Sequence, residues 1–497
     1  MLAIFNFKNL NYYFIIMKKL LVSAIALTFS VAIYAQDTGA QKAVQVAQIP
    51  GSAAGANTGE SIQNGASNAV QVRQAGTEQS VLTNQNGTSN LARLMQTGNV
   101  NGNQALSGQL NLAEVDQDGY NNESTTVQEG DFNNAYTRQN NDAGDASLGN
   151  RAQIMQGTGD NAESNDAAIE QDGQDNSAYT LQTYDNSDAW TIQNGVGNTS
   201  EISQDAGPED SAGHFAIVDQ NGMDNESRVN QSGANGDQDR NSAIARQTGI
   251  GNAVEQIQVS SGAAGGNTAD VLQGFSGDFT VYSTGQDDIF DAVNAFDPSL
   301  AGDDDGAGFV ATNAVAFQTQ TGGENDAVIV QFGDNNNAAQ SQSGDGNVAQ
   351  AIQNLTPDAG FDNVSTQTQV GNDNAATIVQ NDRVHTSVQS QTGDGNTIVA
   401  AQRGTGNYSD VTQEGNGSYG RTLQHGDFNL AFLTQRDGQS YSIYQNQNQF
   451  GGLGGNQADI LQEGPLGTGV QRAFSAFTAG GVTAPHSVSS FTLAPIN

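Results

Sequence analysis

Residues 369–435 decide the fold of this chain. Broken before each recurring glutamine, they read QVGNDNAATIV, QNDRVHTSVQS, QTGDGNTIVAA, QRGTGNYSDVT, QEGNGSYGRTL and QHGDFNLAFLT, and they end on Gln435. Each segment has eleven residues, and in most of them Gly follows the glutamine by two positions and Asn by five. A low-complexity chain without a fold would not keep this phase, so the pattern indicates a stack of repeated structural units.

The same spacing extends through most of the chain. Glutamines stand eleven residues apart in several further runs: Gln63 to Gln96, Gln117 to Gln139, Gln171 to Gln204, and Gln320 to Gln353. Where a unit is longer, as before Gln369, Asn363 still precedes the glutamine by six positions. Insertions therefore fall between Gln and the next Asn, which is how loops behave beside fixed elements. We predict a strand from Asn to Gln and a turn over Gln-x-Gly-x-x-Asn.

Alternation within the constant segment supports a strand. One set of alternate positions reads Asn90-Ala92-Leu94-Gln96, whereas the other set varies between units. A period of two places the constant set on one buried face. We therefore expect an all-β fold, a β-solenoid of stacked strand-turn-strand coils built from 11-residue Gln-x-Gly-x-x-Asn-x-Ala units. Buried Asn and Gln amides would bond up and down the stack at ~4.8 Å spacing. The period leaves open whether a coil holds two or three strands.

Composition excludes several classes of function. The chain has 497 residues, with 16 Lys+Arg against 53 Asp+Glu and a formal net charge of −37. This balance opposes binding to nucleic acid, which needs clustered basic residues. The absence of cysteine excludes disulfides, thiol nucleophiles and thiolate metal sites. Lys42 is followed by Ala43, so it cannot complete a phosphate-binding P-loop. We expect no cofactor.

The N-terminus has the pattern of a targeting segment. Met17, Lys18 and Lys19 precede an uncharged run from Leu20 to Tyr34, and a small residue, Ala35, follows it. This is typical of a secretory signal peptide over residues 1–35, with Met17 as the initiator. A membrane anchor is the alternative, but the apolar run falls short of the ~20 residues that span a bilayer. We therefore expect an exported protein that is not embedded in a membrane.

The remaining chain divides by its repeats. We expect a linker over 36–57, repeat arrays over 58–273 and 313–464, an acidic insertion over 274–312, and a C-terminal cap or tail over 465–497.

The acidic insertion and the scattered histidines are the candidate sites of other kinds. The insertion could bind calcium, yet it lacks the ligand spacing of known calcium loops, so we favour a solvated acidic loop. The acids elsewhere lie mostly in turns, which argues against an enzyme. The histidines are too scattered for a metal or catalytic site: His214, His385, His425 and His486.

The repeat resembles that of a known family over most of residues 58–464. Ser418, Gln424, Gly426, Asn429, Ala431 and Gln435 match the curlin repeat of bacterial curli fibre subunits. The resemblance implies a coil of two strands and polymerisation into extracellular amyloid fibres of the biofilm matrix of Gram-negative bacteria. It also implies a curli-type secretion channel, accessory chaperones and a nucleator subunit as partners. The chain is longer than ordinary curlin subunits, its leading Ser is mostly Asn and it carries insertions, so a major or a minor subunit role stays open.

Our main hypothesis is a secreted structural subunit that assembles with copies of itself by end-to-end pairing of its terminal strands. The residues expected to carry assembly are the ladder amides of the uninterrupted stretch: Gln369, Asn374, Gln380, Gln391, Asn396, Gln402, Asn407, Gln413, Gln424, Asn429 and Gln435. The alternative is a monomeric, capped β-solenoid that acts as an adhesin or binds a surface. An ice-binding variant would need repeated outward Thr-x-Thr, and the outward residues are mixed, including Arg93, Tyr136, Trp190 and Glu201.

Overall fold

The fold is described from a computed structural model. The structure describes residues 56–98, 108–141, 148–157, 162–207, 212–233, 240–260, 265–274, 310–354, 360–446 and 455–462. The predicted signal peptide, nearly all of the predicted linker and the acidic insertion, and the C-terminal tail lie outside these residues. The chain divides into two compact units between Ala311 and Thr312, and each is described by itself.

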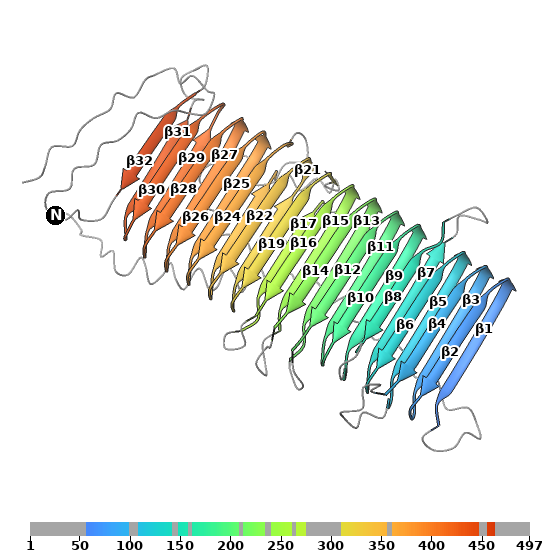
Figure 1. Cartoon of the computed structure of the whole chain (residues 1–497). Helices are drawn as coiled ribbons and strands as arrows, with labels where there is room; N and C mark the ends of the chain where they lie inside the picture. Colours follow the sequence, from blue (N-terminus) through green and yellow to red (C-terminus); the bar gives the residue numbers. More distant parts are fainter. Residues whose placement is uncertain are drawn as a thin grey trace, which may run out of the picture. The chain divides into compact units, whose positions relative to one another are not determined.

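Unit 1 contains two parallel sheets whose strands alternate along the chain (Figure 1). The odd-numbered sheet consists of β1 (Thr58–Ala66), β3 (Ser80–Thr88), β5 (Leu112–Tyr120), β7 (Asn134–Asn141), β9 (Asp166–Gln174), β11 (Asp188–Val196), β13 (Phe215–Met223), β15 (Ser242–Ile250) and β17 (Thr268–Gln273). The even-numbered sheet consists of β2 (Ala69–Ala75), β4 (Leu91–Thr97), β6 (Glu123–Glu129), β8 (Arg151–Gln156), β10 (Ser177–Thr183), β12 (Thr199–Asp205), β14 (Glu226–Ser232) and β16 (Ala253–Val259).

Unit 2 repeats this arrangement. One sheet consists of β19 (Val315–Thr321), β22 (Asn337–Ser343), β24 (Val364–Val370), β26 (Thr386–Thr392), β28 (Tyr408–Glu414), β30 (Leu430–Arg436) and β32 (Gln457–Gln462). The facing sheet consists of β20 (Asp326–Gln331), β23 (Val348–Gln353), β25 (Ala375–Arg383), β27 (Thr397–Thr405), β29 (Tyr419–His425) and β31 (Ser440–Asn446). Two short strands complete the set: β18 (Ala311–Thr312), at the division between the units, and β21 (Gly333–Asp334).

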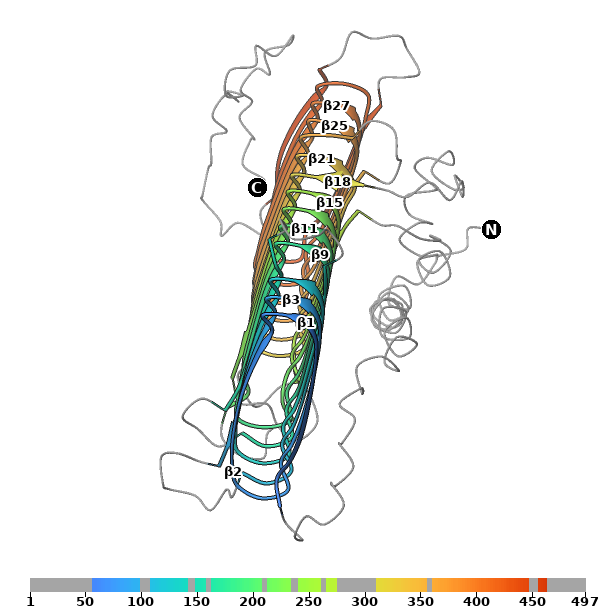
Figure 2. The same ribbon diagram turned by 90° about the vertical axis from the view of Figure 1, so that its right-hand side faces the viewer.

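Within each unit, and leaving aside the short strands β18 and β21, every second strand pairs in parallel and in register, so one coil contains two strands. β1 pairs with β3 through Gln63↔Gln85, and β2 pairs with β4 through Gln74↔Gln96. Figure 2 shows the two sheets as facing layers joined by the turns. The all-β solenoid predicted from the sequence is confirmed, and the question of two or three strands per coil is decided in favour of two.

Insertions leave the register intact. β3 pairs with β5 through Gln85↔Gln117 although the chain between them carries additional residues after Gln96. The same is seen across the longer connection between Gln353 and Gln380, which remain paired. The pairing of the described strands is thus kept across the insertions, as the constant Asn-to-Gln segment predicts.

The core lies between the two sheets and is mixed in character. Alternate residues point inward, so Asn90, Ala92, Leu94 and Gln96 are all buried within one turn-and-strand segment. Aliphatic side chains of facing sheets pack in small clusters, such as Val81, Ala92, Leu94, Ala113 and Val115. The apolar rows lie between columns of buried amides, so the interior depends on both hydrophobic burial and hydrogen bonding.

The strand ends differ from the prediction. Many strands start after the Asn position and end one residue beyond the Gln, as in β24, and others extend through the Gly that was assigned to the turn, as in β27. The reason is that the Gly residues stack above one another as the strand residues do. Gly195 of β11, for instance, has a φ of 120°, and a Cβ there would lie 2.0 Å from the carbonyl oxygen of its strand partner Gly222 in the next coil. Only glycine permits so close an approach of two backbones.

Candidate functional site: the buried amide ladders

Each buried glutamine links its coil to the next coil and to the opposite sheet. Nε2 of Gln391 donates to Oε1 of Gln413 and to the backbone carbonyl of Ala375, both at 3.0 Å. Oε1 of Gln391 accepts from Nε2 of Gln369 at 2.9 Å. The side chain is completely buried. One amide therefore uses both of its donor hydrogens and its acceptor without any water.

These bonds form continuous ladders with a fixed direction. In every bond the earlier glutamine donates to the later one, at an Nε2–Oε1 distance of 2.8–3.0 Å. In unit 1 the ladders run through Gln63, Gln85, Gln117, Gln139, Gln171, Gln193, Gln220, Gln247 and Gln273, and through Gln74, Gln96, Gln128, Gln156, Gln182, Gln204, Gln231 and Gln258. In unit 2 they run through Gln331, Gln353, Gln380, Gln402, Gln424 and Gln445, and through Gln320, Gln342, Gln369, Gln391, Gln413, Gln435 and Gln462.

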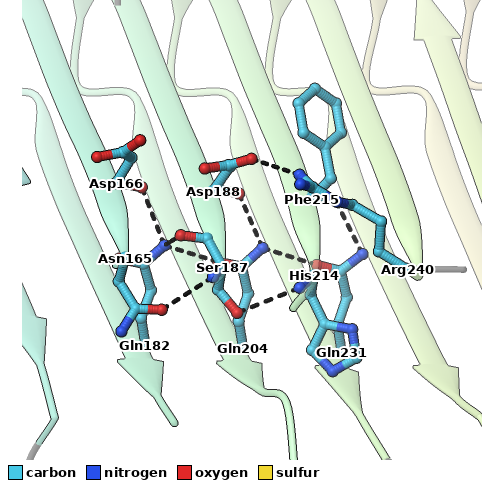
Figure 3. A network of polar contacts seen from close by, with 10 residues as sticks. All are labelled: Asn165, Asp166, Gln182, Ser187, Asp188, Gln204, His214, Phe215, Gln231 and Arg240. Atoms are coloured by element: carbon cyan, nitrogen blue, oxygen red, sulfur yellow. Dashed lines mark hydrogen bonds and ion pairs between the residues drawn. The ribbon is translucent and has the colours of Figure 1, made fainter. Parts of the chain in front are cut away.

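Figure 3 shows one section of a ladder in unit 1. Nε2 of Gln204 donates to Oε1 of Gln231 at 3.0 Å and to the carbonyl of Asp188 at 2.9 Å. The carboxylate of Asp188 also forms an ion pair with Arg240. The carbonyl of Asp188 thus accepts a hydrogen bond inside the stack, while its side chain places a charge on the outer face. This is possible because side chains alternate between the two faces of a strand.

The asparagine columns run in the opposite direction and fix the turns. Nδ2 of Asn374 donates back to Oδ1 of Asn347 at 3.0 Å and to the carbonyl of Gly393 at 2.7 Å. Oδ1 of Asn374 accepts from the backbone N–H of Asn396 at 3.0 Å and from its Nδ2 at 3.1 Å. Each asparagine therefore satisfies turn groups that would otherwise be buried without partners.

Histidine and serine occupy some asparagine positions. The backbone N–H of His385 donates to Oδ1 of Asn363 at 2.9 Å, Nδ1 accepts from the backbone N–H of Asn407 at 3.3 Å, and Nε2 lies 2.7 Å from the carbonyl of Asn381. This arrangement fits a neutral ring that accepts at Nδ1 and donates at Nε2. Burial lowers the pKa of His385 to about 4, because the interior disfavours the charged ring.

His214 has the same role in unit 1. Its backbone N–H donates to the hydroxyl of Ser187 at 3.2 Å, and Ser187 itself occupies an asparagine position (Figure 3). Nε2 of His214 lies 3.0 Å from the carbonyl of Asp205. Burial lowers the pKa of His214 to about 4 as well. Both histidines therefore belong to the asparagine columns.

The residues predicted to carry assembly fall into four columns of unit 2. All eleven are buried: Gln369, Gln391, Gln413 and Gln435 in the sheet of β24, Gln380, Gln402 and Gln424 in the facing sheet, Asn374 and Asn396 at one row of turns, and Asn407 and Asn429 at the other. Each column brings its own members together in consecutive coils. They lie inside the stack, so only ladder residues of a terminal strand are placed to contact another molecule.

Sequence reasoning missed a second glutamine ladder. In β19, β22, β24 and β26 the inward aliphatic position is glutamine, and Gln318, Gln340, Gln367 and Gln389 are bonded in sequence at 2.8–3.0 Å. They also donate across the interior, as Gln389 does to the carbonyl of Thr377 at 2.8 Å. The signal was present as a Gln-x-Gln pair at the end of each strand, for example at Gln367 and Gln369.

The ladders end at the terminal strands that the structure describes. β1 and β2 pair only with β3 and β4, and β31 and β32 pair only with β29 and β30 among the described strands. Most of β1 is exposed. Gln63 donates to Gln85, and no described residue donates to its Oε1. These ends are where the pattern of bonds can continue into another molecule.

Other kinds of site find no support in the described ranges. No three His, Asp or Glu side chains there are grouped as metal ligands require. Of the outward residues noted in the sequence, Arg93 and Glu201 lie on the even-numbered sheet of unit 1, and Tyr136 and Trp190 on the odd-numbered sheet. The part of the chain covered by the structure also contains no helix that is long and apolar enough to cross a membrane. The predicted acidic insertion and His486 lie outside the described residues.

No protein-family model matches the chain, and no characterised protein is significantly similar to it. The resemblance to the curlin repeat therefore depends on the repeat residues themselves.

Proposed function

We propose that the chain is a secreted structural subunit of curli-like extracellular amyloid fibres, which supports a biofilm matrix and cell adhesion. Its subunits would join end to end by β-strand pairing. The observation that carries this proposal is the continuous, directional amide ladder that reaches the terminal strands. An unpaired strand edge with matching amides is a template for the strand of another molecule.

The direction of the ladders determines how two copies could join. Each glutamine donates toward the C-terminal end of its unit. Gln445 and Gln462 in the last strands of unit 2 therefore have Nε2 groups to offer, and Gln63 and Gln74 in the first strands of unit 1 have Oε1 groups to offer. A bond between copies therefore requires the end at β31 and β32 to meet the end at β1 and β2. Such a head-to-tail contact leaves one donor end and one acceptor end in every pair of copies, and it builds a fibre where its repetition does not close into a ring.

The shapes of the two ends support the same pairing. Tyr441 of β31 pairs with Gly420 of β29, in a column of inward positions, and it is 37% exposed. In the first coil the same column holds Gly59, which pairs with Val81. A Cβ at Gly59 would meet no atom closer than 3.8 Å, so the fold of a single chain does not require glycine there. Glycine leaves room for the ring of Tyr441 from another copy.

The test compares elongation of residues 36–497 with that of the Gly59→Val variant after dilution from denaturant. A cross-β dye and fibre diffraction with ~4.7 Å and ~10 Å spacings would follow assembly. We expect the unchanged chain to elongate and to be seeded by its own fragments, and Gly59→Val to elongate at least tenfold more slowly. Tyr441→Ala in the same chain should restore growth to Gly59→Val, because it removes the ring that valine obstructs.

A stable β-rich monomer that never elongates would refute the fibre and leave the capped adhesin or surface-binding solenoid. Equal elongation of the unchanged chain and Gly59→Val would retain the fibre but reject the proposed end contact. Export through a curli-type channel, chaperones and a nucleator subunit belong to the same proposal, and export is tested by detecting the chain outside the producing cell.

A further inference from the structure

One outward surface of unit 2 contains no charged residue. It is formed by the outward side chains of β19, β22, β24 and β26, and we call it the hydroxyl face. Its members are Val315, Phe317, Thr319, Thr321, Asn337, Ala339, Ser341, Ser343, Val364, Thr366, Thr368, Val370, Thr386, Val388, Ser390 and Thr392. In a chain of net charge −37 this is an unusual surface.

The absence of charge is not a consequence of the fold. The corresponding face of unit 1 carries ion pairs, including Arg228 with Glu201 at 3.2 Å and with Glu255 at 3.8 Å. In unit 2 the hydroxyl face is bordered by Asp410 and Glu414 on β28. The same backbone therefore accepts charged residues at these positions elsewhere.

The hydroxyl face is open and regular. Phe317 is 42% exposed, Val364 39% and Val370 46%, although they are apolar. In-register pairing aligns its members in columns, such as Thr319, Ser341, Thr368 and Ser390. Small side chains in straight columns allow two sheets to approach to ~10 Å and interdigitate without a layer of water.

We infer that the hydroxyl face docks against the hydroxyl face of a second copy of this chain. Two copies with the same large negative charge repel each other through most of their surface. This face is where they can approach without placing like charges together. A two-fold contact of this kind is self-complementary, since every contact between two positions occurs twice, once in each direction.

The size of the contact predicts its strength. Four strands at ~4.8 Å and seven residues at ~3.3 Å give roughly 440 Å² per copy, or about 900 Å² in total. This lies below the ~1,200–2,000 Å² of stable complexes, so a single contact should be weak and transient. Repetition along a fibre would make it strong by multivalency and would bind fibres side by side. The contact is separate from the strand ends and does not depend on them.

The test uses the natural absence of cysteine. Ser341→Cys places one thiol on the hydroxyl face, and Ser203→Cys places one on the charged face of unit 1 as a matched control. Both are made in the full chain with Gly59→Val, and cross-linking is measured on the protein that stays in the supernatant after centrifugation, so the result does not depend on whether the unchanged chain forms fibres. With a short bis-maleimide linker we expect at least tenfold more cross-linked dimer from Ser341→Cys, and loss of that excess when Thr368→Asp is added.

Equal cross-linking of the two cysteine variants would overturn the inference. Retention of the excess in the presence of Thr368→Asp would also overturn it, because a carboxylate in the centre of the face should repel its counterpart. If Ser341→Cys shows no excess while the protein co-sediments with crystalline polysaccharide or changes the shape of ice crystals, the face serves a solid surface and not a second copy.

Discussion

The substitution Gln391→Leu tests whether the amide ladder stabilises the stack. It removes three hydrogen bonds of one side chain: from Gln369, to Gln413 and to the carbonyl of Ala375. At about 1 to 1.5 kcal/mol each, these bonds contribute about 3–4.5 kcal/mol. Burial of the leucine offsets about 1–2 kcal/mol of this loss. We therefore expect a net destabilisation of about 2–3 kcal/mol around β26.

Native-state hydrogen exchange is the assay, because coils of a solenoid interact only with their neighbours and the effect should be local. A loss of about 2–3 kcal/mol corresponds to a roughly 30–150-fold loss of amide protection in β24, β26 and β28. The control is Gln153→Leu, which replaces a glutamine on the outer face of β8 that belongs to no ladder. Its effect should stay within about 0.5 kcal/mol. If protection in Gln391→Leu fell no more than in the control, the buried amides would not be what stabilises the stack.

Three further predictions concern single residues of unit 2. The pKa of His385 is about 4 in the folded state and 6.5 in the unfolded state, so the stability that the neutral ring contributes is complete above pH 6.5 and is lost as the pH falls toward 4. The substitution His385→Asn removes this loss. The free energy of unfolding of the variant, compared with the unchanged chain, should therefore be about 2 kcal/mol higher at pH 5 than at pH 8. Urea unfolding at both pH values measures this, and an equal effect at both would contradict a buried neutral ring. Asp326→Asn should act in the opposite sense, because burial raises the pKa of Asp326 from 3.8 to about 7. The buried carboxyl destabilises the native state as the pH rises from 4 through 7, so the variant should gain about 4 kcal/mol at pH 8 and little at pH 4 in the same titration. A gain that does not change with pH would refute this. Gly393→Ala should lower the free energy of unfolding by at least about 2 kcal/mol more than Gly395→Ala does. Both glycines have a positive φ, but only a Cβ at Gly393 would lie 2.2 Å from a neighbouring carbonyl oxygen. Similar thermal midpoints of the two variants would contradict the stacked-glycine geometry.

Much of the buried pattern could be predicted because it is local. The alternation in Asn374-Ala376-Ile378-Gln380 already separates inward from outward positions, and the structure buries all four. The strand ends could not be predicted, because the glycine after the glutamine permits either a turn or a stacked extension. The second ladder at Gln367 and Gln389 was missed although a Gln-x-Gln pair marks it in the sequence. The pair alone does not show that the facing backbone accepts the hydrogens of an inward glutamine.

The sequence by itself determined that the chain stacks, which side chains are buried and where insertions leave the stack. These follow from a period of two within each strand and from the constant distance between Asn and Gln. Only the tertiary structure decided that every second strand pairs and that the donor direction of the glutamine ladders is opposite to that of the asparagine columns. It also decided that the outward side chains of four neighbouring strands form a face without charge. Those features depend on contacts between residues of neighbouring coils, and the spacing of residues along the sequence does not specify which strands become neighbours.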